Sequence, residues 1–425
     1  MTAGWWCLGV GVGLAIYSYM LYPALVAAVG WIRPAPGRPK PPDEWPLVSI
    51  TVPVYNEAAH IRAKLEKILE WDYPAERRQV LVVSDASTDD TDRIVREFAG
   101  RGVELVRLPQ RGGKTAAENA ALAHLKGSIV VNSDASIDVP AGSLKALIIW
   151  FSDPTVGVAS CRDVSVSSVA AEANQGESGY VGYEMGVRRL ETRAGGIVGA
   201  SGCFYAIRIH LHQHLVPEAL SRDFAAPLVA RRYGFRSVSV DDAIAFVPRT
   251  TSLRREYSRK VRTMTRGLET LYFHRGLLNP FRYGLFAWEL WSHKLIRWLV
   301  PWGGVLVFAG LALLAPGVLW ARFLLILAGL GVLAGAAGWW WPAERGLPRV
   351  LSIPTYALAG NVAAIQAWIG ALRGDLNPIW EPTRRPAAVP GTSDSSNAAG
   401  AGSRETAPGA GSRGTTPGAG SRTPR

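Results

Sequence analysis

Two acidic side chains follow apolar runs that have the character of buried strands. The tetrapeptide Ser-Asp-Ala-Ser occurs around Asp85 and again around Asp134, directly after the runs Val80–Val83 and Ile129–Val131. Short β-branched runs of this kind are typical of strands buried on both faces of a mainly parallel sheet. Such sheets bind ligands just beyond the carboxyl ends of their strands. We therefore expect both acids to lie at a ligand site.

The first of these acids has two possible roles. Asp85 can accept hydrogen bonds from a base N–H or a ribose hydroxyl. Alternatively, it can cap the helix that is expected to begin near Asp89, a role that Ser87 could fill alone. We favour nucleotide binding because of the motifs described below.

A lysine stands at the start of a predicted helix. Lys114 follows Gly112 and Gly113, and free backbone N–H groups at such a position can meet a phosphate or a base together with the lysine. The sequence Gly113-Lys114-Thr115 also mimics the end of a P-loop. A P-loop requires glycine where Leu108 stands, so we reject that interpretation.

The segments that must position these residues alternate between strand and helix patterns. This alternation predicts an α/β domain with a parallel sheet, Rossmann-like in its first half and less regular in its second. We interpret it as one domain whose second half faces an acceptor. The predicted strands are Leu47–Val54, Val80–Ser84, Val103–Arg107, Ser128–Ser133, Val156–Cys161, Phe204–Arg208 and Ser237–Val240, and the predicted helices are Ala58–Trp71, Asp89–Phe98, Thr115–Leu125, Gly179–Arg193 and Asp223–Arg232.

Four other stretches are apolar and approach or exceed the roughly 20 residues that span a bilayer. Trp5–Ile32 contains no charged residue, and the first residues, Met1–Gly4, lack the basic region of a signal peptide. We therefore expect a retained anchor. The other three stretches are Leu299–Trp320, Phe323–Trp341 and Leu351–Leu372.

Basic residues flank the first two of these stretches on the side of the predicted domain. By the positive-inside rule, the domain between them is cytoplasmic. Four spans would place the tail on the other side of the membrane, so one span could be re-entrant, or the first could be a hairpin at Pro23. The flanking residues are Arg33, Arg38, Lys40, Arg282, Lys294 and Arg297.

Composition narrows the function classes further. The formal net charge of +12 is concentrated in Ser252–Gly267, a helix-compatible stretch near the membrane, which favours lipid headgroups or a diphosphate as partners and not nucleic acid. The three cysteines show no metal-ligand spacing and are expected to be free thiols. The predicted spans carry no buried ionisable residue, which disfavours a transporter.

The chain therefore divides into six parts. Residues 373–425, expected to be disordered from about 387 because they repeat Gly-Ala-Gly-Ser-Arg, form the C-terminal tail. The other five are an anchor (1–32), a linker (33–46), the α/β domain (47–251), a basic interfacial amphipathic region (252–298) and about three transmembrane helices (299–372).

Short motifs follow one another along the chain in an order that resembles the membrane-bound family 2 glycosyltransferases, which include cellulose, hyaluronan and poly-N-acetylglucosamine synthases. Each motif alone is weak, but the ordered set is specific. The motifs are Pro53–Glu57, Ser84–Asp89, Gly113-Lys114, Ser133–Ser136, Gly199–Gly202, Arg222–Phe224, Arg259–Arg262 and Trp380–Arg384.

This resemblance implies a GT-A fold and the inverting transfer of a hexosyl or N-acetylhexosaminyl group from a nucleotide sugar, usually a UDP-sugar. It implies Mg²⁺ or Mn²⁺ as cofactor, held by Asp134, with Ser136 as a weak ligand where the family often has a second acid. Asp138 is an alternative ligand, although a surface position before Pro140 is favoured for it. The implied donor-binding residues are Pro53, Tyr55, Asn56, Glu57, Asp85, Lys114, Asp134 and Arg262.

The resemblance also implies roles on the acceptor side. Asp223 is the candidate general base, although it could instead cap the helix that follows. Gly202 and Glu191 lie in the acceptor region. Processive synthases carry tryptophan after the arginine that corresponds to Arg262, where this chain has Thr263. We therefore expect limited transfer to a lipid or glycan, with processive polysaccharide synthesis as the alternative.

Other classes remain as alternatives. A catalytically silent, nucleotide-binding membrane scaffold would fit Ser136, but Asp85, Asp134 and Asp223 together favour an enzyme. A sugar nucleotidyltransferase would require a glycine-rich N-terminal loop that we do not find. The favoured interpretation is an enzyme of the cell membrane, multi-pass, with a cytoplasmic catalytic domain and with membrane lipids among its partners.

Overall fold

A seven-stranded sheet forms the centre of the protein. The computed structural model describes residues 1–33, 37, 39–166, 175–214, 216–248, 252–342 and 347–375. The strands lie in the order β3-β2-β1-β4-β6-β5-β7. Their bounds are β1 Val48–Val54, β2 Arg78–Ser84, β3 Val103–Arg107, β4 Ile129–Ser133, β5 Val156–Val166, β6 Phe204–Arg208 and β7 Arg236–Pro248.

The sheet is mixed and mainly parallel, as predicted. Strands β1, β2, β3 and β4 pair in parallel, and so do β5 and β7, whereas β6 runs antiparallel between β4 and β5. Val54 pairs with Ser84 at the ends of β1 and β2. The carboxyl ends of the parallel strands therefore meet at one edge, which is where Asp85 and Asp134 follow their strands.

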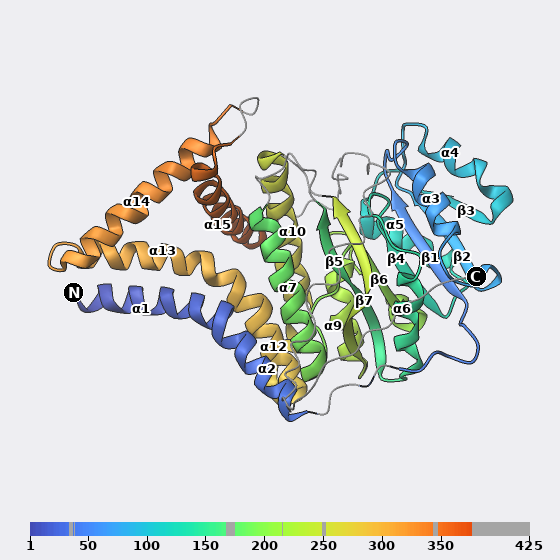
Figure 1. Cartoon of the computed structure of the whole chain (residues 1–425), viewed down its shortest axis with the longest axis horizontal. Coiled ribbons are helices and arrows are strands. Elements are labelled where there is room, and N and C mark those ends of the chain that lie inside the picture. The colour runs from blue at the N-terminus through green and yellow to red at the C-terminus, as the bar shows by residue number, and fades with distance from the viewer. Residues whose placement is uncertain are drawn as a thin grey trace, which may run out of the picture. The chain divides into compact units, whose positions relative to one another are not determined.

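Helices cover both faces of the sheet, because both faces are apolar. Ile61, Leu65 and Ile68 of α3 (Ile61–Leu69) pack on one face together with α4 (Thr91–Glu97) and α6 (Ser143–Ile148). The opposite face is covered by α5 (Lys114–Ala121), α8 (Ile209–His212) and α9 (Arg222–Arg232). The result is the three-layer α/β arrangement visible in Figure 1.

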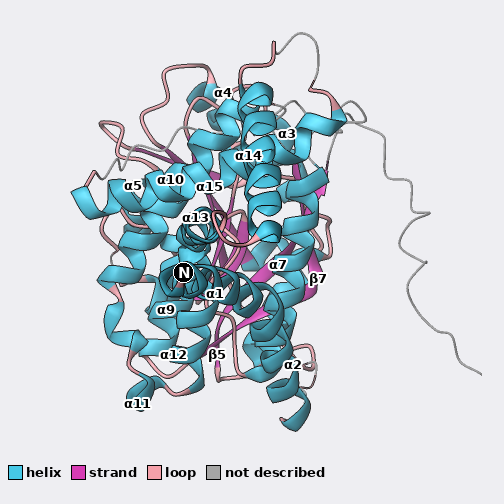
Figure 2. Cartoon of the chain, turned by 90° about the vertical axis from the view of Figure 1, so that its left-hand side faces the viewer, coloured by secondary structure: helices cyan, strands magenta, loops and turns pink. Residues whose placement is uncertain are grey.

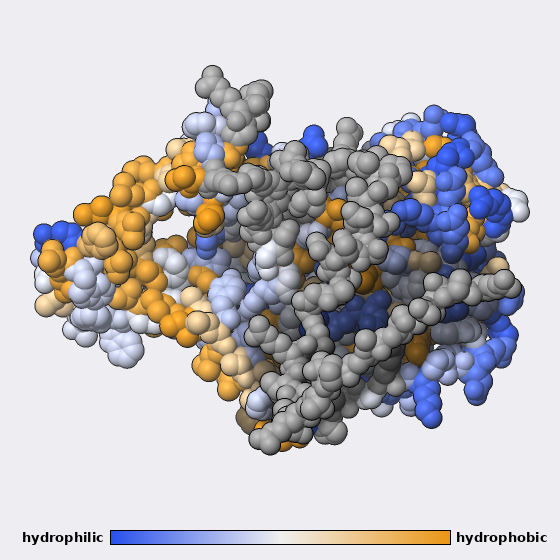
Figure 3. All heavy atoms as spheres, viewed as in Figure 1, coloured by the Kyte–Doolittle hydropathy of each residue, from blue (hydrophilic) through white to orange (hydrophobic). Residues whose placement is uncertain are grey.

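Four helical segments are long and apolar enough to cross a membrane: Thr2–Ile32, Leu285–Leu314, Leu319–Trp339 and Val350–Arg373. The first comprises α1 (Thr2–Ile16), a π-helical turn (Tyr17–Leu21) and α2 (Tyr22–Ile32), and the second comprises α12 (Leu285–Leu290), a π-helical turn (Trp291–Ile296) and α13 (Arg297–Leu314). The others are α14 (Leu319–Trp339) and α15 (Arg349–Arg373). Their apolar surface gathers on the side away from the sheet (Figure 3).

Small residues bring the first two segments into close contact. A Cβ atom added at Gly303 of α13 would lie 3.1 Å from the Gly11 carbonyl oxygen of α1. Glycine at such positions lets membrane helices approach backbone to backbone. Figure 2, in which α1 and the N-terminus face the viewer, shows this helical side of the protein.

Two long helices, α7 (Gln175–Ala194) and α10 (Leu253–Phe273), lie between the sheet and the apolar helices (Figure 1). Val187 of α7 packs against Tyr22 and Val26 of α2. Tyr257 of α10 contacts Gln366 of α15 through a hydrogen bond. These contacts hold the sheet domain against the apolar helices.

The second apolar segment differs from the sequence prediction. It begins at Leu285, inside residues 252–298, which were expected to be interfacial. It therefore contains His293 and Arg297, which are 1% and 5% exposed. This corrects the expectation that the spans carry no buried ionisable residue. That expectation failed because the polar side chains interrupt the apolar pattern without interrupting the helix.

Several predictions cannot be compared with the structure. The motif Trp380–Arg384 and the tail from 387 lie outside the described residues, and so do residues 34–36 and 38 of the linker. The three cysteines Cys7, Cys161 and Cys203 are free, as expected.

Candidate active site

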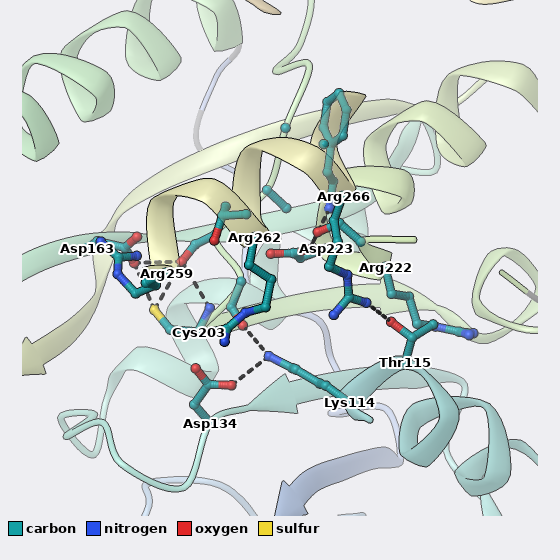
Figure 4. A pocket seen from close by; sticks show the side chains of 18 of the residues that line it. Lys114, Thr115, Asp134, Asp163, Cys203, Arg222, Asp223, Arg259, Arg262 and Arg266 are labelled. Carbon is teal, nitrogen blue, oxygen red and sulfur yellow. Dashed lines mark hydrogen bonds and ion pairs between the residues drawn. The ribbon is translucent and has the colours of Figure 1, made fainter. Parts of the chain in front are cut away.

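A cavity of about 360 Å³ opens at the carboxyl edge of the sheet. Its walls come from the starts of α5 and α9, the Gly199–Gly202 loop, α10 and the segment that joins α12 to α13. More basic than acidic side chains line it, which favours an anionic ligand. Figure 4 shows Asp134 and Lys114 on one side of the cavity, facing the arginines of α10.

Asp134 and Lys114 form an ion pair on the sheet side of the cavity. The Lys114 ammonium donates hydrogen bonds to Asp134 Oδ1 at 2.6 Å and to the Gly202 carbonyl oxygen at 2.7 Å (Figure 4). Burial alone would lower the pKa of Lys114, but the carboxylates of Asp134, Glu118 and Asp223 raise it above its usual value. The lysine is therefore a permanent cation beside the carboxylate.

The donor set suits a hard divalent cation. Asp134 lines the cavity with its side chain 18% exposed, and a cation such as Mg²⁺ is commonly held by one or two carboxylates together with substrate phosphates. Asp138, the alternative ligand, instead pairs with Lys67 at 2.7 Å and is 40% exposed. Asp134 is thus the carboxylate near which a metal-bound diphosphate would fit, with Ser136 close along the chain.

Asp223 lies in the first turn of α9, opposite Gly202 of the Gly199–Gly202 loop. Its Oδ1 accepts hydrogen bonds from the Phe224 N–H at 2.9 Å and from the Ser221 hydroxyl. Its Oδ2 has no hydrogen-bond partner in the described part of the chain and lies against Gly202, where any Cβ atom would collide with it. The carboxylate therefore contributes to the helix start with one oxygen and presents the other to the cavity.

Helix α10 supplies the facing wall. Arg259, Arg262 and Arg266 all line the cavity (Figure 4), since positions three and four apart share one face of a helix. Arg266 donates hydrogen bonds to Thr115 Oγ1 at 2.8 Å and to the Leu220 carbonyl oxygen. The basic stretch thus turns one face towards the cavity.

The remaining predicted donor residues lie beside the cavity and do not line it. Asp85, 1% exposed, accepts hydrogen bonds from Gly112 N–H at 2.7 Å and Gly113 N–H at 2.9 Å. It therefore shapes the turn that precedes Lys114, and it does not cap α4. Nucleotide contact by Asp85 stays a prediction.

The loop after β1 is tied to the loop after β2. Asn56, with a left-handed φ of 52°, accepts a hydrogen bond from Thr88 N–H at 2.8 Å. Glu57 N–H donates to Thr91 Oγ1 at 2.8 Å, and the Tyr55 ring stacks under the Arg111 guanidinium at 3.8 Å. Pro53 lies within β1. These contacts fix the loops around Asp85.

A buried polar cluster joins α7 to the apolar helices next to the cavity. His293 lies between two carboxylates: its Nε2 is 3.0 Å from Glu184 and its Nδ1 contacts Glu191. Arg297 Nη1 lies 2.7 Å from Glu184, and the Tyr22 hydroxyl donates to Glu191 at 2.5 Å. Although burial opposes ionisation, the surrounding charges of His293, Lys294 and Arg188 hold the pKa of Glu184 well below its usual range.

The buried polar cluster contains Glu191, which was predicted to lie in the acceptor region. Glu191 is 0% exposed and does not line the cavity. It is part of the contact between the domain and the apolar helices. Gly202, the other predicted acceptor residue, does line the cavity.

Several side chains that line the cavity were not among the predicted site residues. Asp163 comes from β5. Lys294 and Trp298 come from the second apolar segment, Arg188 from α7 and Glu118 from α5. Burial raises the pKa of Glu118. The sequence signal for Lys294 is a basic residue just before the predicted span Leu299–Trp320.

Cys161, Asp163 and Cys203 also converge, with ligand atoms within 4.8 Å of one another. Asp163 Oδ1 accepts a hydrogen bond from Ser201 Oγ at 2.7 Å and from Cys203 Sγ at 3.0 Å. Burial raises the pKa of the Cys161 thiol. The thiols therefore act here as weak hydrogen-bond donors within the core.

Comparison with known proteins agrees with this geometry. The family "Glycosyl transferase family 2" matches residues 49–215. The chain carries a glycosyltransferase family 2 domain. The mixed sheet and the similarity to one solved structure, described next, show that its fold is GT-A, as the motif order had implied.

The most informative solved structure is the mannosyltransferase PcManGT from Pyrobaculum calidifontis in complex with GDP-Man and Mn²⁺. It is 25% identical, with a TM-score of 0.65, and the match covers 86% of this chain and 99% of that one. The likeness thus includes the apolar helices as well as the GT-A domain.

Curated relatives match over shorter segments. The β-monoglucosyldiacylglycerol synthase of Synechocystis sp. is 27% identical over 198 residues, which cover 40% of this chain and 41% of that protein. The glycosyltransferase AglE of Haloferax volcanii is 35% identical over 91 residues, which cover 21% of this chain and 30% of that protein. Less than half of each of these relatives is therefore matched.

Proposed function

We propose that the protein is a metal-dependent, inverting membrane glycosyltransferase that transfers one sugar from a nucleotide diphosphate donor to an acceptor reaching the cavity from the membrane. A single observation carries the proposal. The carboxylates of Asp134 and Asp223 line one cavity at the sheet edge, and the same cavity is bounded by a residue pair from an apolar segment, Lys294 and Trp298.

The donor diphosphate belongs on the side of Asp134. Asp134 would hold the Mg²⁺ or Mn²⁺ ion, which when bound neutralises the diphosphate and stabilises it as a leaving group. Lys114 and Arg262 face the same space and would stabilise the charge that develops on the departing nucleotide. The Mn²⁺ and GDP-Man of the Pyrobaculum neighbour support a nucleotide sugar and a divalent metal.

Asp223 would act as the general base. Its Oδ2 faces the cavity and is fixed in place by the two hydrogen bonds that Oδ1 accepts. An acceptor hydroxyl placed at this oxygen would lose its proton to Asp223 while attacking the anomeric carbon from the side opposite the diphosphate. One displacement of this kind inverts the anomeric configuration.

Trp298 would replace the stacking ring that the Arg262-Thr263 sequence lacks. It lines the cavity, packs edge-on against Phe224 at 5.8 Å, and reaches α10 only because Gly267 has no side chain: a Cβ atom there would lie 3.0 Å from the indole. A ring presented by an apolar helix suits an acceptor anchored in the membrane. This arrangement favours limited transfer to a lipid-linked acceptor over processive polymerisation.

The test is nucleotide release by the purified full-length protein with Mn²⁺ and a lipid extract. The panel contains UDP-glucose, UDP-galactose, UDP-N-acetylglucosamine and GDP-mannose, and we expect turnover of a UDP-sugar, with labelled sugar appearing in the lipid fraction. Turnover of GDP-mannose alone would show that the nucleobase of the donor is guanine and not uracil. If the wild type binds donors but turns them over no faster than the Asp223→Asn variant does, the protein is instead a silent nucleotide-binding scaffold.

A further inference from the structure

Two basic side chains at the membrane end of the cavity have donors that the protein does not use. Arg188 is 7% exposed, and its Nη1 has no hydrogen-bond partner in the described part of the chain. Lys294 Nζ likewise has no hydrogen bond there, and it sits over the Phe224 ring at 5.6 Å. Both residues line the cavity. Burying a cation whose N–H donors have no acceptor destabilises the folded protein unless a ligand accepts those hydrogen bonds.

Glu184 does not use up these two charges. Its oxygens are engaged by Arg297 at 2.7 Å and by His293 at 3.0 Å, whereas Arg188 Nε and Lys294 Nζ lie 3.5 and 3.6 Å away. Those longer distances are attractive electrostatically but lie beyond good hydrogen-bond geometry. Arg188 and Lys294 therefore keep N–H groups available on the cavity side.

The Gly199–Gly202 loop sets these cations beside the reaction centre. A Cβ atom at Gly199 would lie 3.1 Å from Lys294 Cε, and Arg188 Nη2 lies 3.4 Å from the Ala200 carbonyl oxygen. At the other end of the same four residues, Gly202 touches the Asp223 carboxylate. The two cations thus lie on the acceptor side of the general base, and Lys114 and Asp134 lie on the donor side.

We propose that Arg188 and Lys294 form an anion subsite that binds the phosphate of a lipid-linked acceptor. The planar guanidinium of Arg188 and the point charge of Lys294 converge from two helices, a combination that suits a tetrahedral oxyanion. The assignment of this phosphate to the acceptor rests on the proposed function, whereas the subsite itself is defined by two residues that line the cavity. It predicts discrimination against neutral lipids, such as diacylglycerols.

Equilibrium binding to the purified full-length protein in detergent tests the subsite. Farnesyl phosphate is the probe and farnesol its uncharged counterpart, and we expect the phosphate to bind at least about tenfold more tightly, as charge-assisted hydrogen bonds imply. Arg188→Met and Lys294→Met should each remove about tenfold or more of that affinity, and Lys294→Arg should retain most of it. Lys294→Met decides the question if Arg188→Met does not fold.

The matched control is Arg189→Met, because Arg189 lies on the same helix but is 54% exposed and pairs with Asp241 outside the cavity. Its affinity for farnesyl phosphate should equal that of the wild type. Equal binding of farnesol and farnesyl phosphate overturns the proposal, and so does unchanged affinity in both Met variants. If inorganic phosphate displaces the probe at similar concentrations, the claim that the bound phosphate belongs to a lipid is overturned. None of these outcomes depends on sugar transfer, so failure of the proposed function remains separable.

Discussion

The proposed donor side of the cavity, around Asp134 and Lys114, and its membrane side are built in different ways. Asp134 and Lys114 follow a strand and open a helix within one contiguous stretch of the GT-A domain, and short motifs mark them. Arg188, Lys294 and Trp298 come from α7 and from an apolar segment, and the contact that holds them, His293 with Glu184, joins residues 109 positions apart. The donor side is thus local in sequence, whereas the membrane side exists only after packing.

This difference suggests a division of labour. A nucleotide diphosphate and its metal make similar demands in every enzyme that uses them, and strand ends meet those demands with few residues. The acceptor side instead depends on how the apolar helices dock against the domain. Substitutions on the two sides should therefore have separable kinetic signatures.

The largest effect is expected at the boundary between the two sides. Asp223→Asn keeps the shape of the side chain but removes the base, so kcat should fall by about 10²–10⁴-fold, with donor affinity unchanged. Sugar transfer and donor binding are measured separately on the same preparation. Normal turnover in this variant would mean that another group, such as Glu118, takes the proton.

The next largest effect is expected on the donor side. Asp134→Asn removes the carboxylate that would hold the metal, and kcat/KM for the donor should fall by about 10²–10³-fold, the range for loss of one electrostatic stabiliser. Chelation of divalent cations should reduce the wild type similarly, and added Mn²⁺ should restore only the wild type. Asp138→Asn is the matched control, because Asp138 pairs with Lys67 at the surface.

A smaller effect is expected on the membrane side. Trp298→Leu removes the ring proposed to stack on the acceptor, which should raise the acceptor KM by up to about tenfold, given what such contacts contribute. Slow donor hydrolysis without acceptor should remain as in the wild type. Trp291→Leu, which changes a ring 41% exposed, serves as control. A change in donor KM instead would place Trp298 on the donor side.

The smallest effect concerns the stability of the region around α10, the helix that forms one wall of the cavity. His274 directly follows the last residue of α10, and burial, together with nearby Arg232, lowers its pKa from 6.5 to about 4. Between these two values the unfolded chain binds a proton that the folded protein does not. The free energy of unfolding should therefore fall as pH falls from 6.5 to 4, by at most about 3 kcal/mol.

Denaturant unfolding of wild-type and His274→Gln protein at several pH values checks this expectation. The variant should lose part of the pH dependence between pH 6.5 and pH 4, because glutamine does not titrate. Identical slopes in the two proteins would show that His274 does not contribute to the acid sensitivity.

Sequence patterns predicted the domain well where local rules apply. The strand ends at Ser84 and Ser133 agree with the structure, and α5 begins at Lys114, one residue before the predicted Thr115. Local prediction works here because periodicity and glycine placement act over a few residues. Strand β7 extends to Pro248, beyond the predicted Val240, because its pairing with β5 stabilises residues that have no strong local preference.

The pattern was less informative where charge and apolar residues mix. Leu285–Leu290 did not look like the start of a span because it contains Glu289 and because His293 and Lys294 follow closely. In the structure, carboxylates of α7 pair with His293 and with Arg297 Nη1 within the helix. Only the docked partner shows that such a segment can remain one helix.

Local patterns were enough to predict the GT-A domain, its short motifs and the presence of apolar helices, since these depend on residues near one another along the chain. Tertiary structure alone decided that Lys294 and Trp298 belong to the cavity and that Glu191 does not. The physical reason is that burial and charge compensation are properties of neighbours in space. A lysine such as Lys294, inside an apolar segment, lines a cavity only when the fold turns it towards that cavity.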